Sequence, residues 1–241
     1  MDRYEAIEAA QVKQTEKGGQ KVLIAALKDK YYGLRMKAIR ALNMQNDDIH
    51  NAALPVLTSL AQTDENTLVR AAALNVLAKL KIQSNIDIFK QALSSQSYAV
   101  QGAALNGLNQ LDPAQGLQIA KGFEKDNSGI LTQAMVTVYA ESGNSAQWPF
   151  VYKQFTDADV NGKFALVKNF AKMAGKIDNP AYAQQGIEEL KSLGIKYKSF
   201  GGVTPFVIGL LNDIKNDRAK LKDDASAKAA EDAVKAVNDA K

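Results

Sequence analysis

The repeat is clearest in residues 64–77, which read Asp64-Glu-Asn-Thr-Leu-Val-Arg-Ala-Ala-Ala-Leu-Asn-Val-Leu77. A polar residue opens it, and small or apolar residues follow five, nine, ten and thirteen positions later. This spacing places them along one face of an α-helix, where neighbours are three or four residues apart. The alanine at position nine allows a second helix to approach closely. We therefore predict a helix that follows a tight turn and buries Val69, Leu74 and Leu77.

The same pattern returns along the chain. The opening polar position is filled in turn by Asp29, Asp64, Ser95, Asp126 and Asp157, with spacings of 35, 31, 31 and 31 residues. Ten positions after each lies an apolar residue: Ile39, Leu74, Leu105, Val136 and Val167. A second apolar helical pattern precedes each opening residue. Each unit is therefore predicted to be a helix, a tight turn with the opening residue as N-cap, a second helix and a loop.

Stacked helix pairs of this kind bury a continuous core, which predicts an all-α solenoid with a right-handed superhelix. The units resemble HEAT-type repeats, in which an Asp in the turn and an Arg six positions later form ladders between neighbouring units. Asp29 with Arg35, and Asp64 with Arg70, carry this resemblance. The later units keep polar residues there without the charge pair, so we expect a partial ladder.

The period stops near residue 175. We predict one continuous solenoid domain, with repeats in residues 1–175 and capping helices in residues 176–241. In the second part a helix is expected from Asn179 to Leu190, followed by an irregular link from Lys191 to Gly202. A further helix capped by Thr204 and an exposed, charge-balanced helix after Asp223 complete the prediction.

The composition restricts the chemistry. The chain has no cysteine and a single histidine, His50, so it cannot form a two-histidine zinc site or use a cysteine nucleophile. His50 is expected in an exposed loop, and we assign no catalytic, cofactor-binding or metal-binding residue. The net charge of +4 is spread along the chain, and only five of 30 basic residues are arginines, which argues against nucleic-acid binding. No apolar run reaches the length of a membrane span.

One basic and aromatic cluster stands out, formed by Lys191, Lys196, Tyr197, Lys198 and Phe200. Its three lysines are candidate binding residues for an acidic group, such as a peptide carboxylate or a partner domain. The alternative is a solvated loop whose aromatic residues pack on neighbouring helices.

The first helical pattern, from Asp2 to about Gln14, offers Tyr4, Ile7 and Val12 on an alanine-rich surface. It resembles the second helix of a pair whose first member is missing. We therefore expect this end to pack against a preceding domain. No signal peptide is visible after Met1, and the localisation stays open.

The order of these segments resembles the C-terminal helical-repeat domain of bacterial aminopeptidase N-type zinc metallopeptidases. The resemblance is carried by the stretches Asp2–Ala9, Ala26–Arg35 and Lys196–Lys198. It implies a non-catalytic domain that packs on an upstream catalytic domain and limits substrate access, with the zinc held in that other domain. Two alternatives remain: a free-standing repeat adaptor that binds proteins, and an accessory enzyme resembling the HEAT-like phycobilin lyases.

Overall fold

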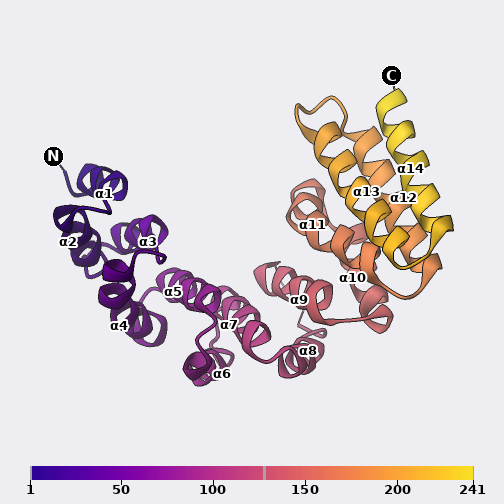
Figure 1. Ribbon diagram of the computed structural model, residues 1–241. Helices are drawn as coiled ribbons and strands as arrows, with labels where there is room; N and C mark the ends of the chain where they lie inside the picture. The colour runs from indigo at the N-terminus through magenta and orange to yellow at the C-terminus, as the bar shows by residue number, and fades with distance from the viewer. Residues whose placement is uncertain (1, 127–128, 241) are drawn as a thin grey trace. The chain divides into compact units, whose positions relative to one another are not determined.

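The computed structural model describes residues 2–126 and 129–240. These residues form fourteen α-helices and two short 3-10 helices, with no strand among them (Figure 1). The predicted all-α solenoid is therefore confirmed. The handedness of the superhelix stays a prediction.

The chain divides into two compact units, of which the first comprises residues 1–119 and 126–134 and the second residues 120–125 and 135–241. The division passes through α8 (Pro113–Gly122) and α9 (Gly129–Ser142). The predicted boundary at residue 175 marks the end of the sequence repeat, whereas this division separates two compact units, so the two boundaries differ.

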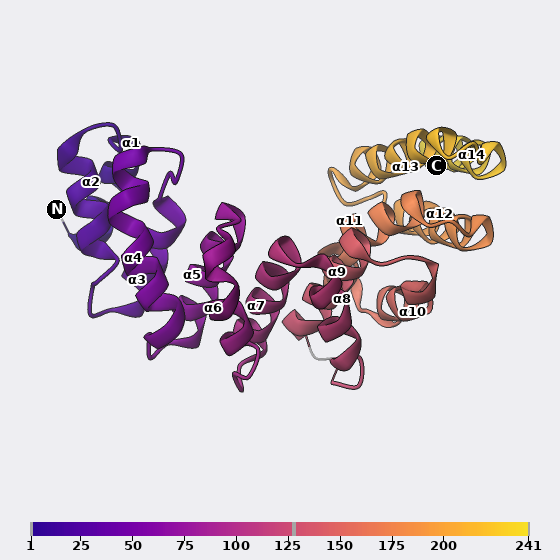
Figure 2. The same ribbon diagram turned by 60° about the horizontal axis from the view of Figure 1, so that its bottom comes forward.

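The first unit has two layers of helices (Figures 1 and 2). One layer consists of helices that each pack on the next: α1 (Arg3–Val12), α3 (Tyr32–Ala41), α5 (Thr67–Leu80) and α7 (Tyr98–Leu111). The other layer consists of α2 (Lys17–Ala26), α4 (Asp47–Thr63) and α6 (Ile86–Ala92), which follows the 3-10 helix η1 (Gln83–Asn85). The α1 helix therefore lies in the layer of the second helices, as the sequence predicts.

The second unit continues the pairing. Here α10 (Trp148–Asp157), preceded by the 3-10 helix η2 (Ser145–Gln147), packs on α11 (Val160–Lys176). The helices that follow are α12 (Pro180–Lys196), α13 (Val203–Lys220) and α14 (Asp224–Asp239). The α13 helix packs on both α11 and α12, so the segment after residue 176 adds a further helix pair to the stack. The last helix, α14, covers α12 and α13.

The residues that the period places on the core face are buried. Those ten positions after the opening residue are at most 3% exposed: Ile39, Leu74, Leu105, Val136 and Val167. Those thirteen positions after it are fully buried in four units, whereas Leu42 is half-buried. The apolar periodicity thus identified the inner face of the second helices correctly.

The prediction that the opening polar residue is the helix N-cap is wrong. The Oδ1 atom of Asp64 accepts a hydrogen bond of 2.9 Å from the backbone N–H of Asn66, and Asn66 is the N-cap of α5. Asp29 accepts in the same way from Tyr31, the N-cap of α3. These side chains close an Asx turn two residues before the N-cap, so they order the turn rather than cap the helix.

The predicted boundaries near the C-terminus also need correction. The helix that was expected to stop at Leu190 continues to Lys196, so the link is shorter than predicted. The next helix begins at Val203 after Gly202, whose φ of 86° is a left-handed conformation that glycine adopts readily. Thr204 is therefore inside the helix and is not its cap.

A buried arginine holds the last helix in place. Arg218 is 2% exposed and donates hydrogen bonds to the Asp223 carboxylate and to the backbone oxygen of Ile177. Asp223 is the N-cap of α14 and accepts from the backbone N–H of Ser226 at 3.1 Å. Burial raises the pKa of Asp223, but hydrogen bonds from Ser226 and Arg218 outweigh this and leave the pKa below its usual value.

The structure bears on two predictions near the N-terminus, which concern the apolar surface of the first helix and the position of His50. Asp2 caps α1 through a capping box with Glu5, and Ile7 is buried, but Tyr4 and Val12 are 52% and 87% exposed. His50 does not lie in a loop, because it belongs to the first turn of α4 and is half-buried.

Candidate functional site

The turns of the first unit carry the predicted ladder. Arg35 donates from Nε and Nη2 to the two carboxylate oxygens of Asp64, each at 2.7 Å, and from Nη1 to the backbone oxygen of Asp29 at 2.8 Å. Both side chains are less than a tenth exposed. The hydrogen bond to Asp64 raises the pKa of Arg35 despite its burial. This contact connects α3 to the turn before α5 and is structural.

The ladder extends to residues that the sequence reasoning missed. Arg3 pairs with Asp29 at 2.7 Å, and the hydroxyl of Tyr98 donates to Asp126 at 2.9 Å. Both Arg3 and Tyr98 are the first residues of their helices, whereas Arg35 is the fourth residue of its own. Arg70 has no carboxylate opposite it in the next turn, and it donates to the backbone oxygen of Ala61 at 3.4 Å. The ladder is partial, as predicted.

The α3–α5 groove is an open groove of about 600 Å³ on the layer of second helices. Its floor and walls are largely apolar and include two methionines, which adapt to differently shaped partners. The lining residues are Met36, Ile39, Arg40, Leu42, Met44, Leu68, Ala71, Ala72, Asn75, Val76, Lys79, Leu80, Ala99 and Ile130. They come from α3 and the turn that follows it, from α5, and from the first turns of α7 and α9, so only the stacked repeats create the groove.

The charged residues that line the α3–α5 groove, Arg40 and Lys79, are both cations. Arg40 and Lys79 are exposed, lie in the last turns of α3 and α5, and form no ion pair within the described part of the chain. No carboxylate is found among the described residues that line this groove. The groove therefore combines an apolar surface with cations at one end.

The other large openings are lined by charges of both signs. An opening of about 950 Å³ between α2 and α4 contains Asp29, Arg35 and Asp64, which the ladder already pairs, and also Lys28, Lys30 and Glu65. A groove of about 660 Å³ between α11 and α13 has Lys168 and Lys172 along one wall and Asp213 and Asp217 along the other. Its mixed charge gives no preference for the charge of a partner.

The structure separates the three lysines that were predicted to bind an acidic group. Lys191 forms an ion pair of 2.6 Å with Glu188, and Lys198 lies exposed in the turn after α12. Only Lys196 reaches an opening, a small one of about 200 Å³ that it shares with Lys163 and Tyr197. Lys163, on α11, was not part of the prediction, since only the packing of α11 on α12 brings it there.

The described residues contain no group of three or more histidine, cysteine, aspartate or glutamate side chains that could hold a metal ion. The hydroxyl of Tyr139 donates to Glu124 at 2.5 Å, and burial together with this hydrogen bond raises the pKa of Tyr139. Its proton is therefore held in a structural contact. Among the helices described, none is long and apolar enough to cross a membrane.

Comparison with known proteins gives one family match. A model of HEAT repeats matches residues 2–78 and, in a second overlapping match, residues 54–140. Together the two matches extend over more than half of the 241 residues. No curated protein matches the chain.

Proposed function

Because this chain belongs to the HEAT-repeat family, we propose that it is a non-catalytic scaffold that binds a segment of another protein in the α3–α5 groove. The observation that carries the proposal is the apolar, solvent-open groove on the layer of second helices. Leu68 and Ile130 within it are 47% and 52% exposed. Apolar surface that is open to water and gathered in a groove is typical of a protein-binding site.

The test blocks the groove without changing the core. Asn75 is exposed on α5 and lines the groove, so Asn75→Trp fills it, and Asn51→Trp on α4 is the matched control. The full chain is used to select 16-residue peptides from a random library displayed on phage. We expect most selected peptides to lose at least tenfold in affinity for Asn75→Trp and to keep it for Asn51→Trp. Peptides that are all indifferent to Asn75→Trp would refute the groove as the binding site.

A narrower proposal is that the scaffold is the C-terminal part of a zinc aminopeptidase, packing on its catalytic domain. It is supported by the sequence resemblance described above and by no further observation. The decisive test is the complete reading frame. An upstream segment with an H-E-x-x-H motif supports the proposal, and its absence from the frame refutes it.

Binding of an acidic group at Lys196 also stays a proposal. The opening beside Lys196 and Lys163 has a volume of about 200 Å³, and Glu189, which accepts a hydrogen bond from the Tyr152 hydroxyl, is the one carboxylate among its described lining residues. A peptide with a free C-terminal carboxylate should bind more weakly to Lys196→Gln than to Lys198→Gln, because only Lys196 faces the opening. Equal affinities for the two variants would contradict this role.

A further inference from the structure

We propose that the segment held in the α3–α5 groove is an acidic helix of another protein, with an apolar face and a cluster of carboxylates near one end. This inference rests on the proposed function and adds the chemistry of the partner. Two observations support it: the position of the exposed apolar residues and the position of the unpaired cations.

The apolar end of the surface lies where the second helices begin. Leu68 is the second residue of α5, and Ile130 is the second residue of α9. Tyr32 and Tyr98, the first residues of α3 and α7, add two rings that are each 40% exposed at the same edge. Exposed side chains at the first or second position of successive helices form an apolar edge rather than scattered single residues.

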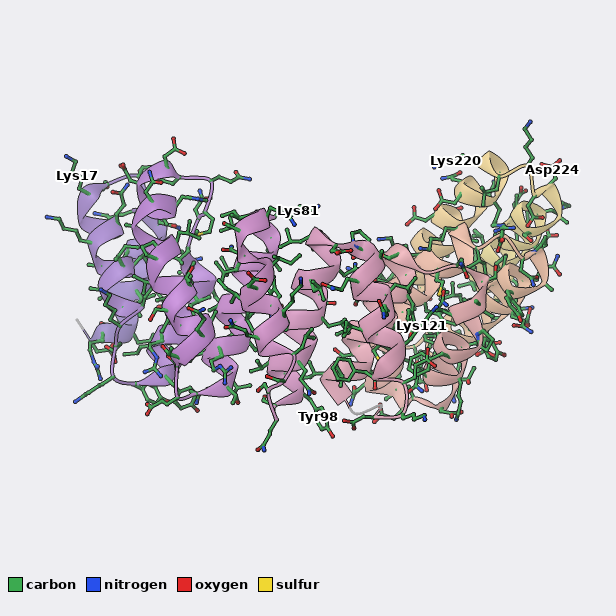
Figure 3. The ribbon with its side chains drawn as sticks, turned by 90° about the horizontal axis from the view of Figure 1, so that it is seen from below. Lys17, Lys81, Tyr98, Lys121, Lys220 and Asp224 are labelled. Atoms are coloured by element: carbon green, nitrogen blue, oxygen red, sulfur yellow. The ribbon has the colours of Figure 1, made fainter. Side chains whose placement is uncertain are left out.

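The basic end lies where the same helices stop. Arg40 and Lys79 occupy the last turns of α3 and α5, and Lys81 follows α5 directly. Figure 3 shows Lys81 and Tyr98 at opposite edges of the first unit. None of these three cations forms an ion pair in residues 2–126 or 129–240. They are therefore available to carboxylates of a partner.

Lys81 stands in an unfavourable backbone conformation. Its φ of 51° is left-handed, at the helix end where glycine or asparagine is usual. Local packing does not require the lysine, because its side chain is exposed. A glycine at this position would relieve the backbone strain but would also remove the positive charge. The lysine at this position therefore supports a binding role for the charge.

The length of α5 determines the spacing that the partner needs. Its 14 residues span about 21 Å at 1.5 Å per residue. Leu68 and Lys79 are 11 residues apart on this helix, or about 16 Å, so a partner helix that lies along the groove must place its carboxylates about three turns from its outermost apolar anchor. The axes of packed helices lie about 8–10 Å apart. Side chains three and four residues apart lie on one face of the partner helix, so they can enter the groove between α3 and α5 together.

The experiment uses the peptides selected by the full chain that lose affinity for Asn75→Trp. We expect them to be rich in Glu and Asp at one end. Arg40→Glu and Lys79→Glu should each weaken their binding roughly three- to tenfold at 50 mM NaCl, and less at 500 mM NaCl, because salt screens exposed charges. Lys90→Glu is the matched control, since Lys90 is an exposed lysine in the last turn of α6, on the other layer.

A charge swap makes the test reciprocal. When the carboxylates of a selected peptide are replaced by lysines, its binding to the native chain should fall, and its binding to the double variant Arg40→Glu, Lys79→Glu should recover. Groove-dependent peptides that are neutral or basic, or that ignore both charge reversals, would overturn the acidic partner and leave the scaffold proposal standing. Absence of any groove-dependent peptide would instead overturn the proposed function itself.

Discussion

Replacement of Arg35 by leucine should destabilise the first unit far more than an equivalent change at Arg3. Both arginines form an ion pair with N···O distances of 2.7 Å, to Asp64 and Asp29 respectively. The two pairs differ in burial, because the side chain of Arg35 is 8% exposed and that of Arg3 is 58% exposed. Distance is therefore matched, and burial is the variable.

The expected magnitude follows from what each change leaves behind. Arg35→Leu leaves the carboxylate of Asp64, itself 4% exposed, without its counterion, and it removes the donor to the backbone oxygen of Asp29. Removing one partner of a buried ion pair costs about 3–5 kcal/mol of unfolding free energy. Arg3→Leu breaks a pair that water already screens, which costs about 1 kcal/mol or less.

Urea unfolding followed by circular dichroism at 222 nm measures this difference. With a slope of about 2 kcal/mol per molar urea, Arg35→Leu should lower the midpoint of the first unit by about 2 M. Trp148 is the single tryptophan and is buried in the second unit, so its fluorescence reports that unit separately. The double change Arg35→Leu, Asp64→Leu should recover most of the loss, because an apolar pair leaves no buried charge.

The reasoning is refuted if Arg35→Leu and Arg3→Leu shift the midpoint equally. It is also refuted if the double variant is as unstable as the single one, because the loss would then come from packing of the long arginine side chain rather than from an unpaired carboxylate.

Three further predictions concern the core and the C-terminal end. Ala104→Asp should lower the free energy of unfolding by about 3–5 kcal/mol, because Ala104 is fully buried. Lys235→Ala, on the exposed face of α14, should change the free energy of unfolding by less than about 0.5 kcal/mol. Equal urea midpoints for the two variants would contradict the assignment of Ala104 to the core and Lys235 to the surface. Gly107→Ala should lower the melting temperature, because the new Cβ would lie 2.2 Å from the buried ring of Phe89. Gly209→Ala should raise the melting temperature, because nothing lies within 4 Å of the new Cβ and alanine favours the helix. A higher melting temperature for Gly107→Ala than for Gly209→Ala would contradict the packing. Asp223→Asn should destabilise the second unit at pH 7. The lowered pKa of Asp223 stabilises the fold fully above the pKa of an unfolded aspartate, about 4, so the difference should shrink as the pH falls from there through the folded-state pKa. In thermal melts followed by tryptophan fluorescence, a difference as large in acid as at pH 7 would contradict this.

The repeat and its buried face could be predicted from the sequence, because apolar periodicity is a local property of each helix. Leu74 and Leu105 occupy the same position of successive repeats, and both are fully buried. The N-cap assignments failed because an aspartate can order a turn or cap a helix, and the sequence alone does not distinguish the two roles. Asp64 orders the turn, and Asn66 caps the helix.

The candidate groove could not be predicted from the sequence, because its lining residues are distant in the chain. Met36, Ala99 and Ile130 line the same groove only when four successive repeats stack. The predicted lysine cluster stays a prediction, but its members are separated in the fold for the complementary reason. Residues that are close in sequence, such as Lys191 and Lys198, lie at different positions around and beyond one helix and do not face the same opening.

The ladder and the groove are parts of one arrangement. Arg35 fixes the first turn of α3 to the turn before α5, and these two helices form the walls of the α3–α5 groove. The first and fourth residues of a helix lie on the same side, so Arg3 on α1 and Tyr98 on α7 make the equivalent connection from the first position of their own helices. A wall spacing set by a buried ion pair before any partner arrives reduces the entropy lost on binding. The charge pair of the repeat therefore stabilises the fold and preorganises the surface that we propose as the binding site.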